Sequence, residues 1–185
     1  MKNLSPIRVF FAFLICLVSA QSQAALLLEP LVGYSVGKFN TEVNPGSVDD
    51  DESLSGISYG GRVGYQNLGF QLGLDYLASN LAVDDDDLKT SELGAFVGFE
   101  FPILVRVYAG YVFSGKGNYE VKNGGEFEFE GATGPKIGVG FTLLPFLDVN
   151  LEYRRISYDT YDLPVGSLDA DYSATMLSFS LPFTI

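Results

Sequence analysis

The sequence Leu147-Asp148-Val149-Asn150-Leu151-Glu152-Tyr153-Arg154 decides the fold. Apolar and polar residues alternate without interruption across this stretch. Because successive side chains of a β-strand point to opposite faces, this period of two predicts a strand with one apolar and one polar face. The same alternation occurs in residues 57–66, from residue 105 onward and in residues 137–143, so the sequence predicts an all-β chain.

Two sequence elements repeat in turn along the chain. The first reads Val63-Gly64-Tyr65-Gln66-Asn67-Leu68, and related versions begin at residues 97, 139 and 177. The second ends in a tyrosine, and its copies end at Tyr34, Tyr76, Tyr111 and Tyr153. Four copies of each element predict eight strands.

The predicted connections alternate between short and long. Residues 67–69, 102–104 and 144–146 have the length of tight turns. Residues 40–55, 79–90, 115–131 and 157–170 are polar and rich in acidic residues, glycine and asparagine, as is typical of long loops. This order predicts an eight-stranded antiparallel up-and-down β-barrel with both termini at the short-turn end, and no helix or second domain after residue 24.

The two faces of the strands differ in a way that predicts which one faces outward. The polar face is rich in glycine, at Gly33, Gly37, Gly60, Gly64, Gly73, Gly94, Gly98, Gly110, Gly138 and Gly140. Glycine weakens a water-exposed strand but suits the inside of a narrow barrel, which side chains alone can fill. The apolar face carries aromatic residues at two levels, as expected at the two boundaries of a membrane. The barrel is therefore predicted to be transmembrane, with its apolar face toward lipid.

The first 24 residues have the features of a cleaved signal peptide. Lys2 and Arg8 precede an apolar run over residues 9–20, which is shorter than the about 20 residues that a transmembrane helix needs. Small residues at positions 22 and 24 predict cleavage after Ala24, so residues 1–24 form the signal peptide and residues 25–185 the barrel domain. The only cysteine, Cys16, follows Ile15, and a lipoprotein signal would have a small residue there.

With these hairpins and aromatic levels, the chain resembles the small eight-stranded outer-membrane barrels, namely the transmembrane domain of the OmpA family and its OmpX-like relatives. The most specific part is the last strand, where Leu177, Phe179, Leu181, Phe183 and Ile185 alternate up to the final residue. Members of this class end in such a strand, usually with an aromatic residue, and the barrel-assembly machinery recognises it; Ile185 departs from that pattern. The resemblance implies location in the cell outer membrane, contact with lipid and lipopolysaccharide, and a monomer.

Charged residues on the glycine-rich face are the candidates for a functional site. They are Glu29, Arg62, Asp75, Glu92, Glu100, Arg106, Lys136, Asp148, Glu152 and Arg154. One interpretation is a structural network, because buried charges must be paired and both signs are present. The other is a set of ion pairs that gates a narrow pore, which the excess of acids would make cation-preferring. The structural interpretation is favoured.

Three segments between the strands carry side chains that could bind a ligand. The acidic runs 49–52 and 84–87 are dense enough to attract Ca²⁺, but neither has the spacing of a calcium loop, so no metal site is predicted. Residues 126–130, Glu-Phe-Glu-Phe-Glu, follow Asn123-Gly124-Gly125, which predicts a hairpin above the membrane. Its edge could pair with a strand of a surface ligand, although a plain solvent-exposed hairpin is favoured.

The composition argues against catalysis and nucleic-acid binding. The chain has no histidine, and its single cysteine lies in the signal peptide, which removes the usual catalytic triads and imidazole metal sites. A net charge of −12 repels nucleic acid. The sequence therefore predicts a non-enzymatic barrel without cofactor, its lumen filled by side chains and its role in envelope structure or surface interaction through acidic loops. The alternatives are the narrow cation-preferring pore and a soluble periplasmic lipid-binding barrel.

Overall fold

A computed structural model describes residues 25–44, 50–84, 86–120, 122, 125–144, 146–159, 161–163 and 166–185. The predicted signal peptide, residues 1–24, lies outside these ranges. The strands are β1 (Ala25–Asn44), β2 (Asp50–Asn67), β3 (Phe70–Val83), β4 (Asp86–Phe101), β5 (Val105–Glu120), β6 (Glu126–Glu130), β7 (Gly134–Leu144), β8 (Leu147–Ser157), β9 (Tyr161–Leu163), β10 (Gly166–Ser180) and β11 (Phe183–Thr184). Within the described ranges, no helix is both long and apolar enough to cross a membrane.

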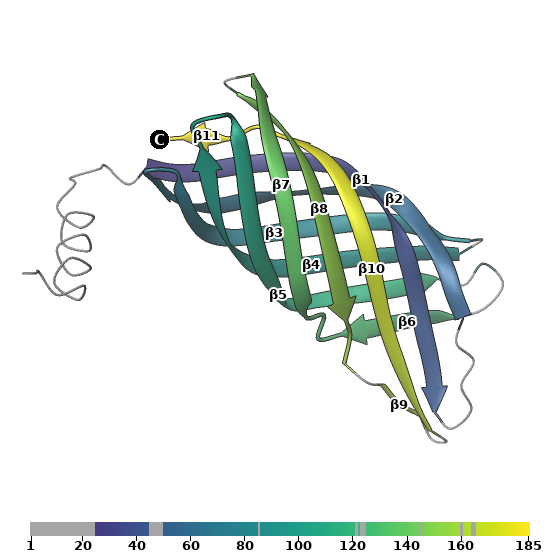
Figure 1. The fold of residues 1–185 in the computed structure, drawn as a ribbon. Helices are drawn as coiled ribbons and strands as arrows, with labels where there is room; N and C mark the ends of the chain where they lie inside the picture. Colours follow the sequence, from purple (N-terminus) through teal and green to yellow (C-terminus); the bar gives the residue numbers. More distant parts are fainter. Residues whose placement is uncertain are drawn as a thin grey trace, which may run out of the picture.

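Eight of these strands form a closed antiparallel barrel (Figure 1). The order around the barrel is β1-β2-β3-β4-β5-β7-β8-β10, and β10 pairs with β1 from Leu31 opposite Ser180 to Asn44 opposite Ser167. The short strands β6, β9 and β11 extend the barrel by pairing with β5, β10 and β1, respectively. The predicted eight-stranded up-and-down barrel is confirmed.

Tight turns join the strands at one end of the barrel. Leu68 and Gly69 link β2 to β3 and both have positive φ, 49° and 85°, which is the conformation of a type I′ hairpin turn. The turn between β4 and β5 has Leu104 at φ 65°, and the Leu104 amide donates to the carbonyl of Phe101 at 3.2 Å. The short connections therefore lie where the sequence predicts them.

The predicted long loops are wrong in extent, because strands occupy most of their residues. β1 continues to Asn44, β2 begins at Asp50, and β3 and β4 are separated only by residues 84 and 85. Their polar composition indicated loops, but an alternation persists in which Phe39, Leu54 and Leu81 point inward and are buried. The strands β1, β3 and β5 therefore continue well beyond the tyrosines that end the second repeat.

A β-bulge interrupts the regular pairing of β5 with β4 just after Tyr111. Leu93 lies opposite Ser114 but Gly94 lies opposite Val112, so one extra residue sits in β5. As a result, Phe113 and Ser114 are both exposed and the inward-facing positions change from even to odd numbers.

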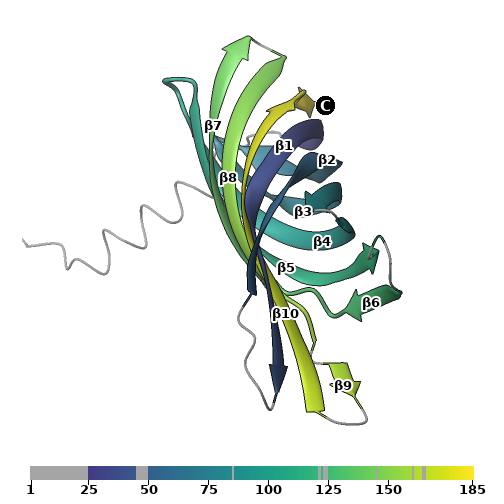
Figure 2. The same cartoon turned by 90° about the vertical axis from the view of Figure 1, so that its right-hand side faces the viewer.

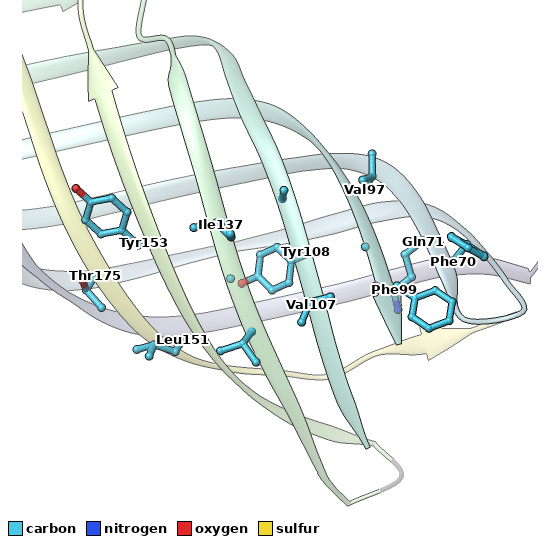
Figure 3. Close-up of a pocket in the computed structure, with 14 residues that line it drawn as sticks. Phe70, Gln71, Val97, Phe99, Val107, Tyr108, Ile137, Leu151, Tyr153 and Thr175 are labelled. Atoms are coloured by element: carbon cyan, nitrogen blue, oxygen red, sulfur yellow. The ribbon is translucent and has the colours of Figure 1, made fainter. Parts of the chain in front are cut away.

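The apolar face of the strands points outward and the glycine-rich face points into the barrel, as predicted. The outward face carries large exposed apolar side chains on every strand of the barrel. The exposed rings include Tyr65, Phe70, Phe141 and Phe146 near the tight turns and Tyr34, Tyr59, Tyr76, Tyr111 and Tyr153 toward the other end. Around the small outward residue Ala109, the wall has an apolar hollow of about 760 Å³ bordered by Val97, Ile137 and Leu151 (Figure 3). The glycines line the inside, where Gly138 lies against the ring of Tyr108.

Gly138 and Gly61 test this assignment of faces. A Cβ atom at Gly138 would overlap the Tyr108 ring, whereas at Gly61 its nearest neighbour would be the Glu29 carbonyl oxygen at 3.4 Å. We expect Gly138→Ala to lower the free energy of unfolding by about 1–3 kcal/mol through overpacking, and Gly61→Ala to change it little. Urea unfolding of the chain refolded in detergent micelles, followed by circular dichroism, measures both. Equal effects would contradict the packing of Tyr108 on Gly138.

Candidate functional site

The lumen of the barrel contains a cluster of buried charges. Four cations, Arg62, Arg106, Lys136 and Arg154, and five carboxylates, Glu29, Asp75, Glu92, Asp148 and Glu152, are buried there. They project from seven of the eight barrel strands, β1, β2, β3, β4, β5, β7 and β8, so the cluster gathers residues far apart in the sequence.

Glu29 accepts hydrogen bonds from three side chains of the lumen. Arg106 donates to both of its carboxylate oxygens, at 2.9 Å to Oε2 and 2.6 Å to Oε1. Arg62 donates to Oε1 at 3.3 Å, and the Ser180 hydroxyl donates to the same oxygen at 2.6 Å. Since both side chains of the Arg106–Glu29 pair are at most 2% exposed, the bidentate contact compensates charges that water does not reach.

A second series of contacts crosses the lumen from Arg62. Its other guanidinium nitrogen donates to Glu152 at 3.0 Å, and Glu152 also binds Arg154. Arg154 donates in turn to Glu92 at 2.8 Å, and Glu92 accepts a hydrogen bond from the hydroxyl of Tyr172. Both signs of charge therefore alternate across the barrel interior.

The remaining charges of the cluster also have partners of opposite charge. Lys136 binds Asp75, and Arg106 lies 3.5 Å from Asp148. The guanidinium of Arg62 also lies 4.2 Å from the centre of the Tyr108 ring, a distance suited to a cation–π interaction.

Glu100 stands apart from this cluster although it also faces inward. Its carboxylate accepts hydrogen bonds from the side-chain amides of Gln66 at 2.9 Å and Gln71 at 3.4 Å. It is half-buried near the tight turns. The structure thus brings nine of the ten candidate charges into the ion-paired interior and gives Glu100 a separate, amide-bound position.

An apolar layer fills the lumen between the buried charges and the barrel end opposite the tight turns. It contains Phe39, Leu54, Leu81, Val83, Leu88, Val112, Phe129, Ala132, Ile156, Tyr158, Ala170, Tyr172 and Ala174. The sequence analysis does not predict this layer, because about half of these residues fall within the predicted long loops and others lie just beyond the ends of the alternating segments. The signal that could have revealed it is the period of two that Phe39, Leu54, Leu81 and Leu88 continue into the acidic segments.

Little space is left among the buried charges. The cavity bordered by Arg62, Asp75, Lys136 and Arg154 has a volume of about 10 Å³. That is roughly the space of one water molecule.

Beyond the aromatic level formed by Tyr34, Tyr76 and Tyr111, charged side chains link neighbouring strands. Lys116 on β5 contacts Glu128 at 3.2 Å and Glu130 at 2.6 Å, both on β6. The hydrogen bond from Lys116 lowers the pKa of Glu130, and that bond likewise raises the pKa of Lys116. These exposed pairs add a small contribution to the backbone pairing that joins β5 and β6.

A hydrogen-bonded cluster surrounds Asp86, the first residue of β4. The backbone amide of Lys122 and the hydroxyl of Tyr119 donate to it, each at 2.9 Å, and both contacts lower the pKa of Asp86. Partial burial, followed by the bond to Asp86, raises the pKa of Tyr119. The acidic runs 49–52 and 84–87 are only partly described, and the described residues contain no acidic group arranged to hold a metal ion.

The sequence profile of the outer membrane protein beta-barrel domain matches residues 10–183. The chain belongs to this family. Comparison with curated protein sequences gives no match. As a member of the outer membrane protein beta-barrel domain family, the chain is located in the outer membrane and its apolar wall faces lipid. The alternative of a soluble periplasmic lipid-binding barrel is therefore wrong, since such a barrel would turn its apolar side chains inward.

Solved structures of small surface barrels share the fold. The neisserial surface protein NspA superimposes with a TM-score of 0.54 at 15% identity, over 85% of this chain and 97% of that one. The attachment invasion locus protein Ail of Yersinia pestis gives a TM-score of 0.57 at 15% identity, over 85% and 98% of the two chains. At this identity the likeness concerns the fold alone.

Removal of the Glu29 carboxylate tests how much its ion pairs stabilise the barrel. Glu29→Ala leaves Arg106 and Arg62 buried without their shared partner, so we expect a loss of about 3–5 kcal/mol of unfolding free energy. Combining Glu29→Met with Arg106→Met removes both charges, and we expect the double variant to lose less than the sum of its single variants. Urea unfolding in micelles measures all of them, with Glu100→Gln as a control of small effect. Additive losses would contradict the Glu29–Arg106 pair.

The Lys116–Glu130 pair predicts a pH dependence of the β5–β6 hairpin. The lowered pKa of Glu130 means that its contribution is complete above the ordinary carboxyl value of 4.5 and is lost as the pH falls through the lowered value. We expect amide hydrogen exchange in β6, corrected for intrinsic rates, to accelerate in that window. Lys116→Met should remove this acceleration, and a variant that retains it would show that another group is responsible.

Proposed function

We propose that this protein is a non-enzymatic outer-membrane barrel with a side-chain-filled lumen, and that it acts in envelope structure or surface interaction through its extracellular strands. The observation that carries the proposal is the filling of the lumen: a paired-charge layer lies beneath an apolar layer. Both layers lie across the path that a solute would have to take.

The two layers oppose ion passage by different means. In the charged layer the cations already hold carboxylates, and the cavity of about 10 Å³ has no room for an ion with its hydration shell. In the apolar layer Leu54, Leu88 and Ile156 offer no polar group to replace the water that an ion would lose. The narrow cation-preferring pore therefore has less support than the filled barrel.

The chemistry of the side chains supports a non-enzymatic role. The chain has no histidine, and its only cysteine is Cys16. The buried carboxylates Glu29, Glu92 and Glu152 each contact an arginine, an arrangement that favours structure over proton transfer.

The outer wall and the terminal strand support the remaining parts of the proposal. The two aromatic levels suit contact with membrane lipid and lipopolysaccharide, and the alternating segment from Leu177 to Ile185 suits recognition by the barrel-assembly machinery. Residues 1–24 would direct export and be cleaved. The strands that rise past the outer aromatic level would present the surface for interaction, and the protein would act as a monomer.

Single-channel recording tests the filled lumen. The refolded chain, checked for folding by its heat-modifiable gel mobility, is incorporated into a planar bilayer beside an open porin as the positive control. We expect no discrete openings from the wild type, because paired charges and apolar side chains of the described residues fill the lumen in both layers. Arg106→Ala and Glu100→Ala are recorded in parallel. Cation-selective openings in the wild type that shift in these variants would overturn the proposal in favour of the pore.

A further inference from the structure

The barrel wall divides above the pair formed by Thr133 and Ser157. The amide of each of these residues donates to the carbonyl of the other at 2.8 Å, which ends the ladder between β7 and β8. Beyond this point β6 pairs with β5, and β9 pairs with β10. Among the described residues β6 and β9 do not pair with each other, and they lie apart in both views (Figures 1 and 2). Each therefore presents one strand edge to the other across the division.

One hydrogen bond shows which backbone groups of β6 face this division. The amide of Asp159 donates to the carbonyl of Glu130 at 3.0 Å, so the backbone polar groups of Glu130 point away from β5. Backbone groups alternate in direction along a strand, so those of Glu128 point to the same open edge while those of Phe129 point toward β5. The open edge thus begins directly beyond the Asp159 contact.

The side chains beside this edge define what could bind there. On the outer face Glu128 and Glu130 are exposed, and Lys116 is the cation that contacts both. On the inner face Phe129 is 4% exposed, and its ring centre lies 5.8 Å from that of Tyr158. A strand added along β6 would place alternate residues beside the glutamates and beside these rings.

We propose that the open edge of β6 binds an extended segment of a partner protein in which basic and apolar residues alternate. Main-chain hydrogen bonds to Glu128 would supply affinity, and basic residues beside the glutamates would supply specificity. A second copy of β6 is a poor partner, because antiparallel pairing of Glu-Phe-Glu-Phe-Glu with itself sets glutamate beside glutamate. The inference rests on the proposed surface role and specifies the partner.

Proline in place of Glu128 distinguishes binding by backbone hydrogen bonds from binding by charge attraction. Glu128→Pro and Glu128→Gln remove the same charge, but only proline removes the outward N–H, and proline is tolerated on an edge strand. The probe is a fluorescein-labelled peptide, Lys-Val-Lys-Val-Lys-Val-Lys, titrated into the full chain refolded in micelles and followed by anisotropy. We expect saturable binding to wild type, a change within about threefold for E128Q, and a loss of about tenfold or more for E128P.

Hydrogen exchange on the wild type provides a second readout that does not depend on folding of the proline variant. Bound peptide should slow exchange at the amide of Glu128 and leave that of Phe129, already directed toward β5, nearly unchanged. Equal affinity of E128P and E128Q, exchange at Glu128 that peptide does not slow, or no saturable binding to wild type would each overturn the proposal. If the bilayer recording is silent, any of these results overturns the β6-edge proposal and leaves the filled-lumen proposal standing. Channel openings, in contrast, would overturn the filled-lumen proposal but not the β6-edge proposal.

Discussion

Closure of the sheet between β1 and β10 is the constraint on which the rest of the structure depends. A bilayer offers no hydrogen-bond partner to a strand edge, so all backbone groups within it must pair with other strands. With eight strands the closed lumen is narrow enough for side chains to fill. That narrowness explains why Gly138 accommodates the ring of Tyr108 and why the outward face carries most of the large apolar side chains.

The same narrowness governs the electrostatics of the interior. A charge that water cannot reach needs an opposite charge or hydrogen bonds, and the lumen supplies these by drawing partners from different strands. Lys136 and Arg154 are direct neighbours across the β7–β8 ladder, yet each binds a carboxylate from the opposite wall, Asp75 on β3 and Glu92 on β4. Such pairs add little net stability compared with apolar packing. Their effect here is to tie one side of the barrel to the other.

The sequence predicts the strands, the tight turns and the outward face because each depends on a local pattern, such as the alternation through residues 147–154. It does not predict which charges meet. Glu100 and Arg106 lie opposite each other in the β4–β5 ladder, but Arg106 turns to Glu29 on β1 and Glu100 to two glutamine amides. These pairings depend on the diameter of the closed barrel, which no single segment of the sequence determines. The extent of the strands was also missed, since acidic outward positions concealed the apolar inward ones.

The contacts of Glu29 have a consequence for biogenesis. Its carboxylate lies on the first strand, while its partners Arg106 and Ser180 lie on the fifth and the last of the eight barrel strands. A barrel that lacks its final strand would hold this anion incompletely solvated beside an open seam. Insertion of β1 alone, or of a partial sheet, is therefore energetically penalised until the end of the chain arrives. One acidic side chain thus joins the first barrel strand to the fifth and to the last, and its set of hydrogen bonds is complete only in the closed barrel.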